Sequence, residues 1–504
     1  MNKNTLLAFG LSALVLIGFQ IFFAPKPQPA AATPETQTSA VSDAQPQPAV
    51  KLEMEKAPQA VEKLETFDIT TDLATYTFNA NTGNIRKAVV TKYGKRDLEN
   101  IVFDSKTEDS FFITVPLVSK YTAEVKEGEK ETAVTFSGSQ GDMVVTKKYV
   151  LTKDSYLVKG DVTVSNTGGR TLNLPLRMGL AGGINSALKE DKYTFGGPQM
   201  FDGKKLREKK VSKIEEPVTA DKPLWVGYTS KYFLAAVANG FDKGEIVKKD
   251  DVADIYGDTE VQVNPSDRKT VEFSVFAGPK EYDLLKTYKL KLEKSIDFGI
   301  FSFIAIPMLK FLKIFYNYVH NYGVAIILLT IVVKLLTFPL TQKSMVSMKK
   351  MGSLAPKMAE IKEKYKADKE KMNQATMELY KKEGVNPFGG CFPMLLQIPI
   401  FFALYKTLLL SIELQGAPFF GWITDLSLKD PYYITPIIMG VTMFLQQKMS
   451  PSTVQDPIQQ KMFMLMPVIF TFMFLTFPAG LVVYWLTNNV LSIAQQYYIN
   501  KKHG

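Results

Sequence analysis

The chain shows two patterns of hydrophobic and polar positions, and the pattern changes near residue 296. Between about Phe67 and Phe276, short stretches of alternating apolar and polar residues are separated by polar turn clusters such as Asn81-Thr82-Gly83-Asn84. Alternation with a period of two, broken by such clusters, predicts antiparallel strands with one buried face. We therefore predict a large antiparallel β-sandwich domain over residues 61–295. It contains no catalytic motif, and its GGINSALKED segment is interpreted as an ordinary loop.

Apolar runs long enough to cross a bilayer occupy the N-terminus and most of the chain after residue 320. A cleaved signal peptide is the alternative for the first run, with Ala30-Ala31-Ala32 as a conceivable cleavage site. We favour a retained anchor because the run exceeds the usual apolar segment of a signal peptide. We thus predict a transmembrane anchor over 1–24. We also predict a core region over 321–499 that contains five further spans, over 322–340, 392–411, 432–447, 462–477 and 480–495.

Two connecting segments have compositions of their own. Residues 25–60 are rich in Pro, Ala, Gln, Thr and Ser, which predicts a disordered linker. Residues 281–295 have a helical pattern. Residues 296–320 are apolar but are broken by Pro307 and carry Lys310 and Lys313, which favours an amphipathic helix lying in the membrane interface.

A polar segment over residues 341–390 predicts a helical hairpin. Apolar residues recur there at spacings of three and four, with a break at Ala367-Asp368. The seam positions are Leu354, Met358, Ile361 and Tyr365 in the first helix and Met372 and Leu379 in the second. Two roles remain open for this hairpin, which are structural support and the docking of a partner.

Charge sets the expected orientation. The 341–390 segment holds 11 Lys against six acidic residues, a net charge of +5, which places it in the cytoplasm by the positive-inside rule. Both termini, including the short basic tail over 500–504, are then cytoplasmic, whereas the β domain lies outside. The overall charge of +10 is spread without a basic stripe and does not indicate nucleic-acid recognition. A single cysteine, Cys391, and two histidines, His320 and His503, exclude an internal disulfide and a His-rich metal site, and we expect no cofactor.

Lys334 is the most informative residue because it lies inside the apolar run GVAIILLTIVVKLLTF. A lysine at mid-membrane is costly, so it either faces a hydrated cavity or snorkels to the surface. Other polar residues at similar depth favour a shared hydrated groove that opens to the cytoplasm. The groove set is Lys334, Thr330, Gln397, Asn488, Asn489 and Ser492.

Two further patterns concern the apolar surface. The last three spans have about 16 residues each and would thin the bilayer around them. Met and Phe residues are also concentrated in the third and fifth spans, which indicates either ordinary helix packing or a sliding surface for varied apolar partners. The sliding set includes Phe401, Phe402, Leu404, Met466, Phe470 and Met473.

Three motifs, NPFGGCFPMLLQIPIFFALYKTL, DPYYITPIIMGVTMFLQQKMSP and QQKMFMLMPVIFTFMFLTFPAGLVVYWLTNN, closely resemble the core of the YidC/Oxa/Alb family of membrane protein insertases. The anchor and β domain resemble the layout of its Gram-negative members. The resemblance implies an inner-membrane protein with a five-helix core and a basic cytoplasmic groove, whose partners are nascent membrane proteins, the Sec translocon, the ribosome or signal recognition machinery, and lipids.

Carried over by position, the resemblance places the groove's basic residue at Lys334, beside Thr330, where the family more usually has Arg. Lys keeps the charge but loses the planar fork that binds a carboxylate in two places. The resemblance also adds Tyr484 and Trp485 to the client-contacting surface. A long basic tail of some relatives has no counterpart here.

We therefore expect a monomeric, non-enzymatic insertase that is driven by hydrophobic partitioning. A small-solute transporter or channel is one alternative, but it would need polar groups through the full membrane depth. An intramembrane enzyme using Ser492 and Lys334 is the other, and it lacks a recognisable catalytic cluster in the sequence.

Overall fold

The computed structural model describes residues 65–91, 101–105, 108–182, 194–366, 368–385, 392–449 and 457–502. Several predictions fall on other residues and lie outside the described part of the chain. They concern the anchor over 1–24, the linker over 25–60, most of the GGINSALKED loop, and the residues Cys391 and His503.

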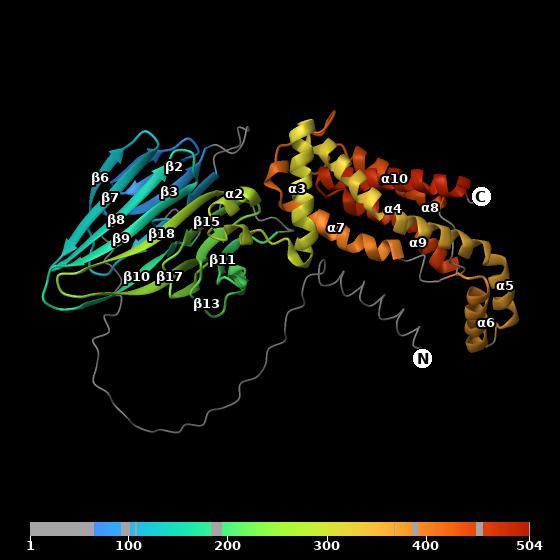
Figure 1. Ribbon diagram of the computed structural model, residues 1–504, viewed down its shortest axis with the longest axis horizontal. Helices are drawn as coiled ribbons and strands as arrows, with labels where there is room; N and C mark the ends of the chain where they lie inside the picture. The colour runs from blue at the N-terminus through green and yellow to red at the C-terminus, as the bar shows by residue number, and fades with distance from the viewer. Residues whose placement is uncertain are drawn as a thin grey trace, which may run out of the picture. The chain divides into compact units, whose positions relative to one another are not determined.

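The described β domain consists of two nine-stranded sheets in which every pair of neighbouring strands is antiparallel (Figure 1). The first sheet has the order β1 (Thr66–Thr70), β2 (Ala74–Asn79), β3 (Asn84–Val90), β5 (Phe111–Thr114), β10 (Leu172–Leu180), β17 (Val252–Val263), β16 (Lys243–Lys249) and β13 (Val218–Asp221), with β4 (Ile101–Asp104) paired to β3. The second has the order β12 (Leu206–Glu208), β11 (Gly197–Phe201), β14 (Trp225–Thr229), β15 (Phe233–Ala238), β18 (Arg268–Pro279), β9 (Leu157–Asn166), β8 (Met143–Thr152), β7 (Glu131–Gln140) and β6 (Thr122–Glu127). Strands β10 and β17 pack against β14 and β15, so the predicted antiparallel sandwich is confirmed.

Alternation explains how these strands form one core. Every second residue of β8 is buried, from Met143 to Leu151. One of these inward positions holds Lys147, whose ammonium donates to the carbonyl oxygens of Ile113 at 2.6 Å and Thr82 at 2.8 Å and to Asn84 Oδ1 at 3.0 Å. Burial lowers the pKa of Lys147 to about 7. A charged side chain is accepted in the core because its donors are satisfied.

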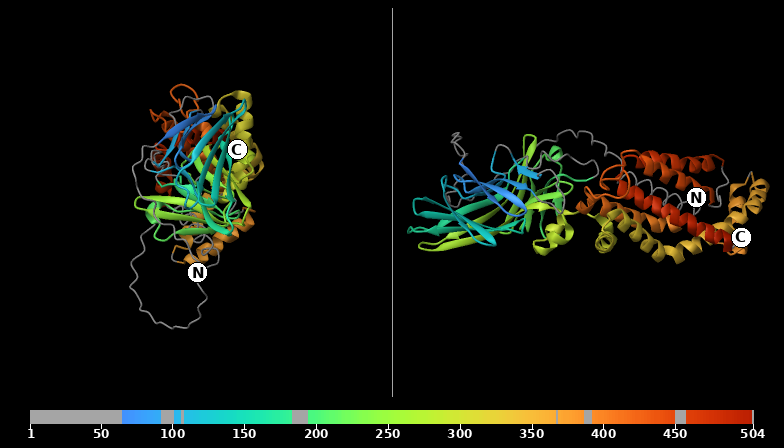
Figure 2. Two further views of the ribbon diagram at one scale, coloured as in Figure 1. Left: turned by 90° about the vertical axis from the view of Figure 1, so that its left-hand side faces the viewer. Right: turned by 90° about the horizontal axis from the view of Figure 1, so that it is seen from above.

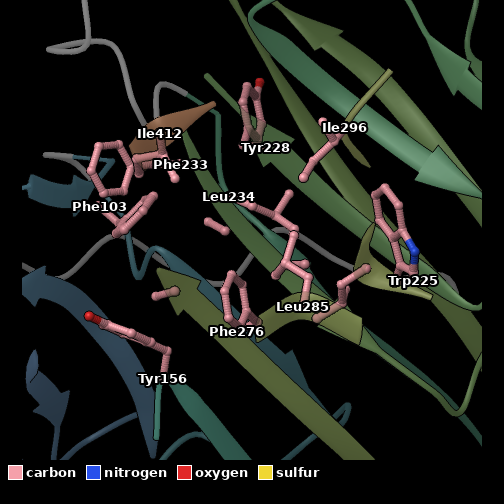
Figure 3. Packing of buried hydrophobic residues seen from close by; sticks show 14 of the residues in the cluster. Phe103, Tyr156, Trp225, Tyr228, Phe233, Leu234, Phe276, Leu285, Ile296 and Ile412 are labelled. Atoms are coloured by element: carbon pink, nitrogen blue, oxygen red, sulfur yellow. The ribbon is translucent and has the colours of Figure 1, made fainter. Parts of the chain in front are cut away.

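The same core continues to the end of the domain that leads into the helices. Figure 3 shows Leu234 of β15 and Phe276 of β18 packed with Leu285 of α2 (Tyr282–Thr287). All three are almost completely buried. Trp225 of β14 links the sheet to the segment after α2, because its indole N–H donates to the carbonyl oxygen of Lys291 at 3.2 Å. The helix α2 is therefore an integral part of the β domain.

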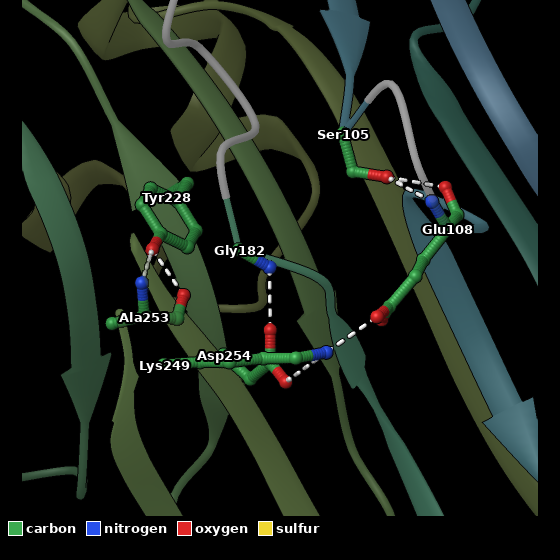
Figure 4. A network of polar contacts seen from close by, with 7 residues as sticks. All are labelled: Ser105, Glu108, Gly182, Tyr228, Lys249, Ala253 and Asp254. Carbon is green, nitrogen blue, oxygen red and sulfur yellow. Dashed lines mark hydrogen bonds and ion pairs between the residues drawn. The ribbon is translucent and has the colours of Figure 1, made fainter. Parts of the chain in front are cut away.

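Charged groups of the β domain are held by local networks. Figure 4 shows the ammonium of Lys249 between Glu108 and Asp254, with the Asp254 contact at 3.9 Å. The Gly182 amide also donates to Asp254 at 2.6 Å. Burial raises the pKa of Asp254, and this amide and the Lys249 ammonium oppose the increase.

The helical region follows α2 through two short 3₁₀ turns, η2 (Leu292–Ser295) and η3 (Gly299–Phe301). Its helices are α3 (Ser302–Val319), α4 (Tyr322–Ser353), α5 (Ala355–Lys364), α6 (Lys369–Lys382), α7 (Phe392–Leu410), α8 (Ile434–Met449), α9 (Pro457–Phe474) and α10 (Ala479–Lys502), with the 3₁₀ turn η5 (Ile412–Leu414) after α7. Figures 1 and 2 show the long helix α4 running beside α10, while α3 crosses the direction of α4 in Figure 1. Among the described residues, Gly299–Val319 and Tyr322–Ser353 are long and apolar enough to cross a membrane.

The helix ends differ from the predicted spans in an informative way. The α4 helix continues 13 residues past the predicted end of its span at residue 340, and α10 continues to Lys502 rather than 495. Apolar composition ends where a helix meets water, but backbone hydrogen bonding does not. Only α8, with 16 residues, keeps the short length that we predicted for the last three spans.

The predicted helix over 281–295 is also shorter in the structure. It ends at Thr287, because Lys289 and Lys291 adopt the left-handed backbone conformation, with φ of 58° and 59°. That conformation interrupts a right-handed helix. A separate 3₁₀ turn, η2, then completes the segment.

Candidate functional site

The interface between α4 and α10 contains the lysine that the sequence singled out. The two helices are parallel, because Ile326 lies beside Gly480 and Thr341 bonds Gln495, so contacting residues advance together along both helices. The residue numbers differ by 154 at both contacts. These two contacts, which lie 15 residues apart along each helix, give the register of the pair.

Lys334 is half-buried in this interface, and its ammonium donates a hydrogen bond to Ser492 Oγ at 2.7 Å. The Ser492 side chain is buried, and its hydroxyl donates to the carbonyl oxygen of Asn488 at 2.7 Å. The two bonds form a donor-to-acceptor chain from the Lys334 ammonium through the Ser492 hydroxyl to the Asn488 carbonyl oxygen. The structure thus brings Lys334 and Ser492 together, and Asn488 takes part through its backbone carbonyl and not through its side chain.

Polar contacts continue from this point toward the C-terminal ends of both helices. Gln495 Nε2 donates to Thr341 Oγ1 at 2.9 Å, and Lys349 Nζ donates to the carbonyl oxygen of Asn500 at 3.2 Å. Gln496 is buried, and its Oε1 has no hydrogen-bond partner among the described residues. We did not select these residues from the sequence, although they follow Ser492 at intervals of three or four on α10 and follow Lys334 at intervals of seven and eight on α4, as one helix face requires.

The other predicted groove residues lie elsewhere. Thr330 is 2% exposed, and its hydroxyl donates to the carbonyl oxygen of Ile326 in its own helix. Asn489 is buried against α8, where its amide contacts Thr442 Oγ1 at 3.2 Å. Gln397 of α7 donates to the buried Tyr484 hydroxyl at 2.7 Å. Thr330 and Asn489 therefore do not line an open groove in this structure, because their polar groups are used in packing.

The predicted sliding surface is largely an aromatic cluster centred on Trp485. Its ring lies 5.1 Å from that of Phe401, 6.0 Å from Phe470 and 5.2 Å from Phe474, which joins α7, α9 and α10. Leu404 and Tyr484, two other residues of the predicted sliding surface, are buried. Phe402 stacks on Phe301 at 6.3 Å, and Met473 packs against the core.

The described part of α9 also has exposed apolar residues, which overlap the cluster residue Phe470 in position along the helix. Met466 is 37% exposed, and its more exposed neighbours face outward. These neighbours are Met464, Leu465, Val468, Ile469 and Phe472. An apolar partner would therefore reach this row of side chains before the cluster around Trp485.

The hairpin residues pack as two short helices joined near Asp368, whose side chain accepts from the Lys371 amide at 3.0 Å and caps α6. Leu354 forms a small buried cluster with Met351 and Val385. The Tyr380 hydroxyl contacts Met358 Sδ at 3.1 Å. Four further seam residues are partly buried, namely Ile361, Tyr365, Met372 and Leu379.

A second charged centre lies at the opposite end of the helices. The Lys313 ammonium of α3 is 3.0 Å from Glu281 Oε1, 2.8 Å from Asp283 Oδ2 and 2.9 Å from Glu413 Oε1. Burial raises the pKa of Glu413, and the Lys313 ammonium opposes that increase. This network connects α2, α3 and η5. No cluster of His, Cys, Asp or Glu suited to a metal ion occurs in the described ranges.

Comparisons with known proteins cover both regions. Residues 314–504 match the family described as 60Kd inner membrane protein, and residues 66–311 match the family described as YidC periplasmic domain. The membrane protein insertase YidC of Geobacter sulfurreducens is 40% identical over 532 aligned positions, which cover 99% of this chain and 98% of the relative. The proteins of the same name from Geobacter metallireducens and Syntrophus aciditrophicus are 41% and 40% identical, with 99% and 100% of this chain and 98% and 100% of the relatives covered.

Among solved structures, a crystal structure of an active YidC insertase with its first transmembrane domain resolved covers 87% of this chain and 93% of that chain. Its sequence identity is 20% and its TM-score is 0.39. The family assignment rests on the sequence relatives instead. With about 40% identity over nearly the full length of these relatives, the chain belongs to the YidC family of inner-membrane insertases that carry a periplasmic domain.

Proposed function

We propose that this protein inserts and helps to fold other membrane proteins. The observation that carries the proposal is the Lys334 ammonium held by Ser492 inside the α4–α10 interface, within an otherwise apolar stretch of α4. A charge at such a position normally marks a functional site. The name of the relatives, membrane protein insertase, supports the same reading.

The proposed topology has six spans, with the anchor followed by α4, α7, α8, α9 and α10. The net charge of +5 over residues 341–390 supports a cytoplasmic position for α5 and α6. Both termini would then be cytoplasmic. The amphipathic helix α3 would lie in the outer interface, since it exposes both apolar residues and Lys310 and crosses the direction of α4.

In the proposed mechanism, a short polar segment of the client enters beside Lys334, while its apolar helix moves along the exposed row of α9 into lipid. Lys334 offers three N–H donors, and Ser492 accepts only one of them. A carboxylate, a backbone carbonyl or water would occupy the others. Hydrophobic partitioning of the client helix supplies the driving force, without a nucleotide or a covalent intermediate.

The same proposal assigns the partners and the hairpin. Clients would be nascent membrane proteins, delivered alone or with the Sec translocon, and the exposed charged faces of α5 and α6 would meet the ribosome or the signal recognition machinery. The protein would act as a monomer.

Reconstituted vesicles test the function directly. Lys334→Ala should lower the insertion of a small, weakly hydrophobic client with an acidic translocated segment by about tenfold, as expected for the loss of one charge-assisted contact. Lys343→Ala is the matched control, because Lys343 is an exposed lysine on the same helix. Equal insertion by both variants would remove the Lys334 charge from the mechanism.

The pair also has the composition of a Ser–Lys hydrolase dyad, so an enzymatic reading needs its own test. Ser492 is only 3% exposed, and its hydroxyl donates to Asn488 rather than to Lys334. A hydroxyl used in this way is not aligned for attack on a substrate. Covalent labelling of Ser492 by a fluorophosphonate probe would contradict the insertase assignment of this pair.

A further inference from the structure

The Lys334 side chain does not bond the residue that lies level with it on α10. The register of the pair is 154 positions, as the Thr341–Gln495 bond shows, whereas Lys334 bonds a residue 158 positions away. The difference of four residues corresponds to one helical turn, or about 6 Å. The ammonium therefore reaches one turn toward the C-terminal ends of α4 and α10 before it meets a partner.

Other polar groups lie in that direction, each with a hydrogen-bond partner of its own. The Thr337 hydroxyl donates to the carbonyl oxygen of Val333 at 3.0 Å, and Thr341 and Gln495 bond each other at 2.9 Å. Within the described residues, Ser492 Oγ is the acceptor that the Lys334 ammonium contacts. Ser492 thus accepts a hydrogen bond from a lysine side chain that extends toward the C-terminal ends of α4 and α10.

The Ser492 hydroxyl is well suited to this task. Its proton is directed to the carbonyl oxygen of Asn488, so its lone pairs face the ammonium. Its burial keeps competing water from this contact. A long, flexible lysine side chain needs such an anchor, because without one it snorkels toward the membrane surface.

We propose that Ser492 is a positioning residue that fixes the depth of the Lys334 ammonium in the membrane. This inference rests on the proposed function. It adds that the depth to which a client's polar segment is drawn depends on a hydroxyl of α10, and not on Lys334 alone. Loss of the hydroxyl would leave the charge in place but move it toward the ends of the helices.

The first experiment measures the position of the amine. Purified full-length protein in vesicles is treated with a membrane-impermeant amine-acylating reagent, and the acylation of Lys334 is followed by mass spectrometry. Ser492→Ala should accelerate acylation by about tenfold, the effect of losing one hydrogen bond to a charged group. Ser492→Thr should restore the slow reaction.

Two internal controls separate depth from misfolding. Thr487→Val removes another hydroxyl of α10, which donates to the carbonyl oxygen of Val483 at 2.7 Å, and it should leave Lys334 as slow as in the unmodified protein. Lys147, buried in the β domain, should stay unreactive in every variant. Equal acylation of Lys334 in Ser492→Ala and Ser492→Thr would overturn the proposal.

The second experiment is a double-mutant cycle on client insertion. Ser492→Ala should lower insertion when Lys334 is present and should have no effect in a Lys334→Met background, because the hydroxyl acts only through the ammonium. If Ser492→Ala lowered insertion by the same factor in both backgrounds, Ser492 would act independently of Lys334, and its positioning role would be refuted. A Lys334→Met variant that inserts normally would instead refute the proposed function of the charge, so the two failures are distinguishable.

Discussion

Replacing Lys313 by methionine should destabilise the protein by about 3 kcal/mol at pH 7, because the change leaves the Glu413 carboxylate buried without an ammonium beside it. The Glu413 side chain is 9% exposed, whereas Glu281 and Asp283 are 34% and 49% exposed. The two more exposed carboxylates are well solvated, so their pairs contribute little. The expected loss therefore comes almost entirely from Glu413.

The pH dependence of this loss follows from the direction of the pKa shift. Burial raises the pKa of Glu413 above the ordinary value of 4.5, and Lys313 is the group that opposes this increase. A carboxyl group with a raised pKa binds its proton more tightly in the folded protein than in the unfolded chain. The free energy of unfolding then falls as the pH rises from about 4.5 through the folded pKa. The defect of Lys313→Met should therefore grow as the pH rises above about 4.5.

Calorimetric unfolding of the detergent-solubilised protein measures the effect, and a loss of 3 kcal/mol corresponds to a decrease in Tm of roughly 6 to 12 °C. Lys310→Met, an exposed lysine of the same helix, is the control and should change the Tm little. The double variant Lys313→Met/Glu413→Gln should recover most of the loss at pH 7. A double variant as unstable as Lys313→Met would refute the reasoning, since no buried charge would remain to explain the defect.

Three other changes have defined outcomes. Gly440→Ala should lower the Tm, because the added Cβ would lie 2.0 Å from Thr471 Oγ1 between α8 and α9. A second substitution, Thr471→Ala, should restore most of the lost Tm. An unchanged Tm in Gly440→Ala would contradict this packing. In chemical unfolding, the free energy of unfolding of the β domain should rise between pH 7 and 10.5. The reason is that burial lowers the pKa of Lys147 to about 7, whereas in the unfolded chain this lysine keeps its proton until about pH 10.5. Lys147→Met should remove this rise. Trp485→Ala should cost about 3 kcal/mol in thermal unfolding through the loss of ring contacts such as that with Phe401, and Trp485→Phe should cost clearly less.

The sequence predicted those parts of the fold that depend on neighbouring residues along the chain. Alternation along β8 and its neighbours predicted the antiparallel sandwich, because side chains on a strand change face at every residue. The start of α6 is local in the same way, since Asp368 caps this helix with its own side chain. The end of α2 was not visible, because it depends on the backbone conformation of Lys289 and Lys291, two residues that do not ordinarily stop a helix.

The site was predicted only in part for a different reason. The sequence grouped Asn488, Asn489 and Ser492 by depth, and the structure places only the Ser492 side chain against Lys334, with Asn488 contributing its backbone carbonyl. Asn489 is rotated by about 100° from Asn488 and packs on α8 instead, although both amides lie at similar depth. The depth of a residue in the membrane follows from the hydropathy of its helix. The helix that its side chain faces depends on which helices become neighbours in the fold. Contacts such as Thr341–Gln495 join residues 154 positions apart, and one sequence contains no signal for that pairing.

The parallel pairing of α4 and α10 has a consequence for how the protein itself is made. Lys334 is synthesised 158 residues before the hydroxyl that holds it, so in the proposed topology α4 would enter the membrane before its partner helix exists. During that interval the lysine carries the insertion cost of about 2.5 to 3.5 kcal/mol without Ser492 to offset it. That cost favours the docking of α10 as soon as it emerges. The charged site of this protein is therefore completed late in its own biogenesis, and a nascent copy would gain its activity only after α10 has joined α4.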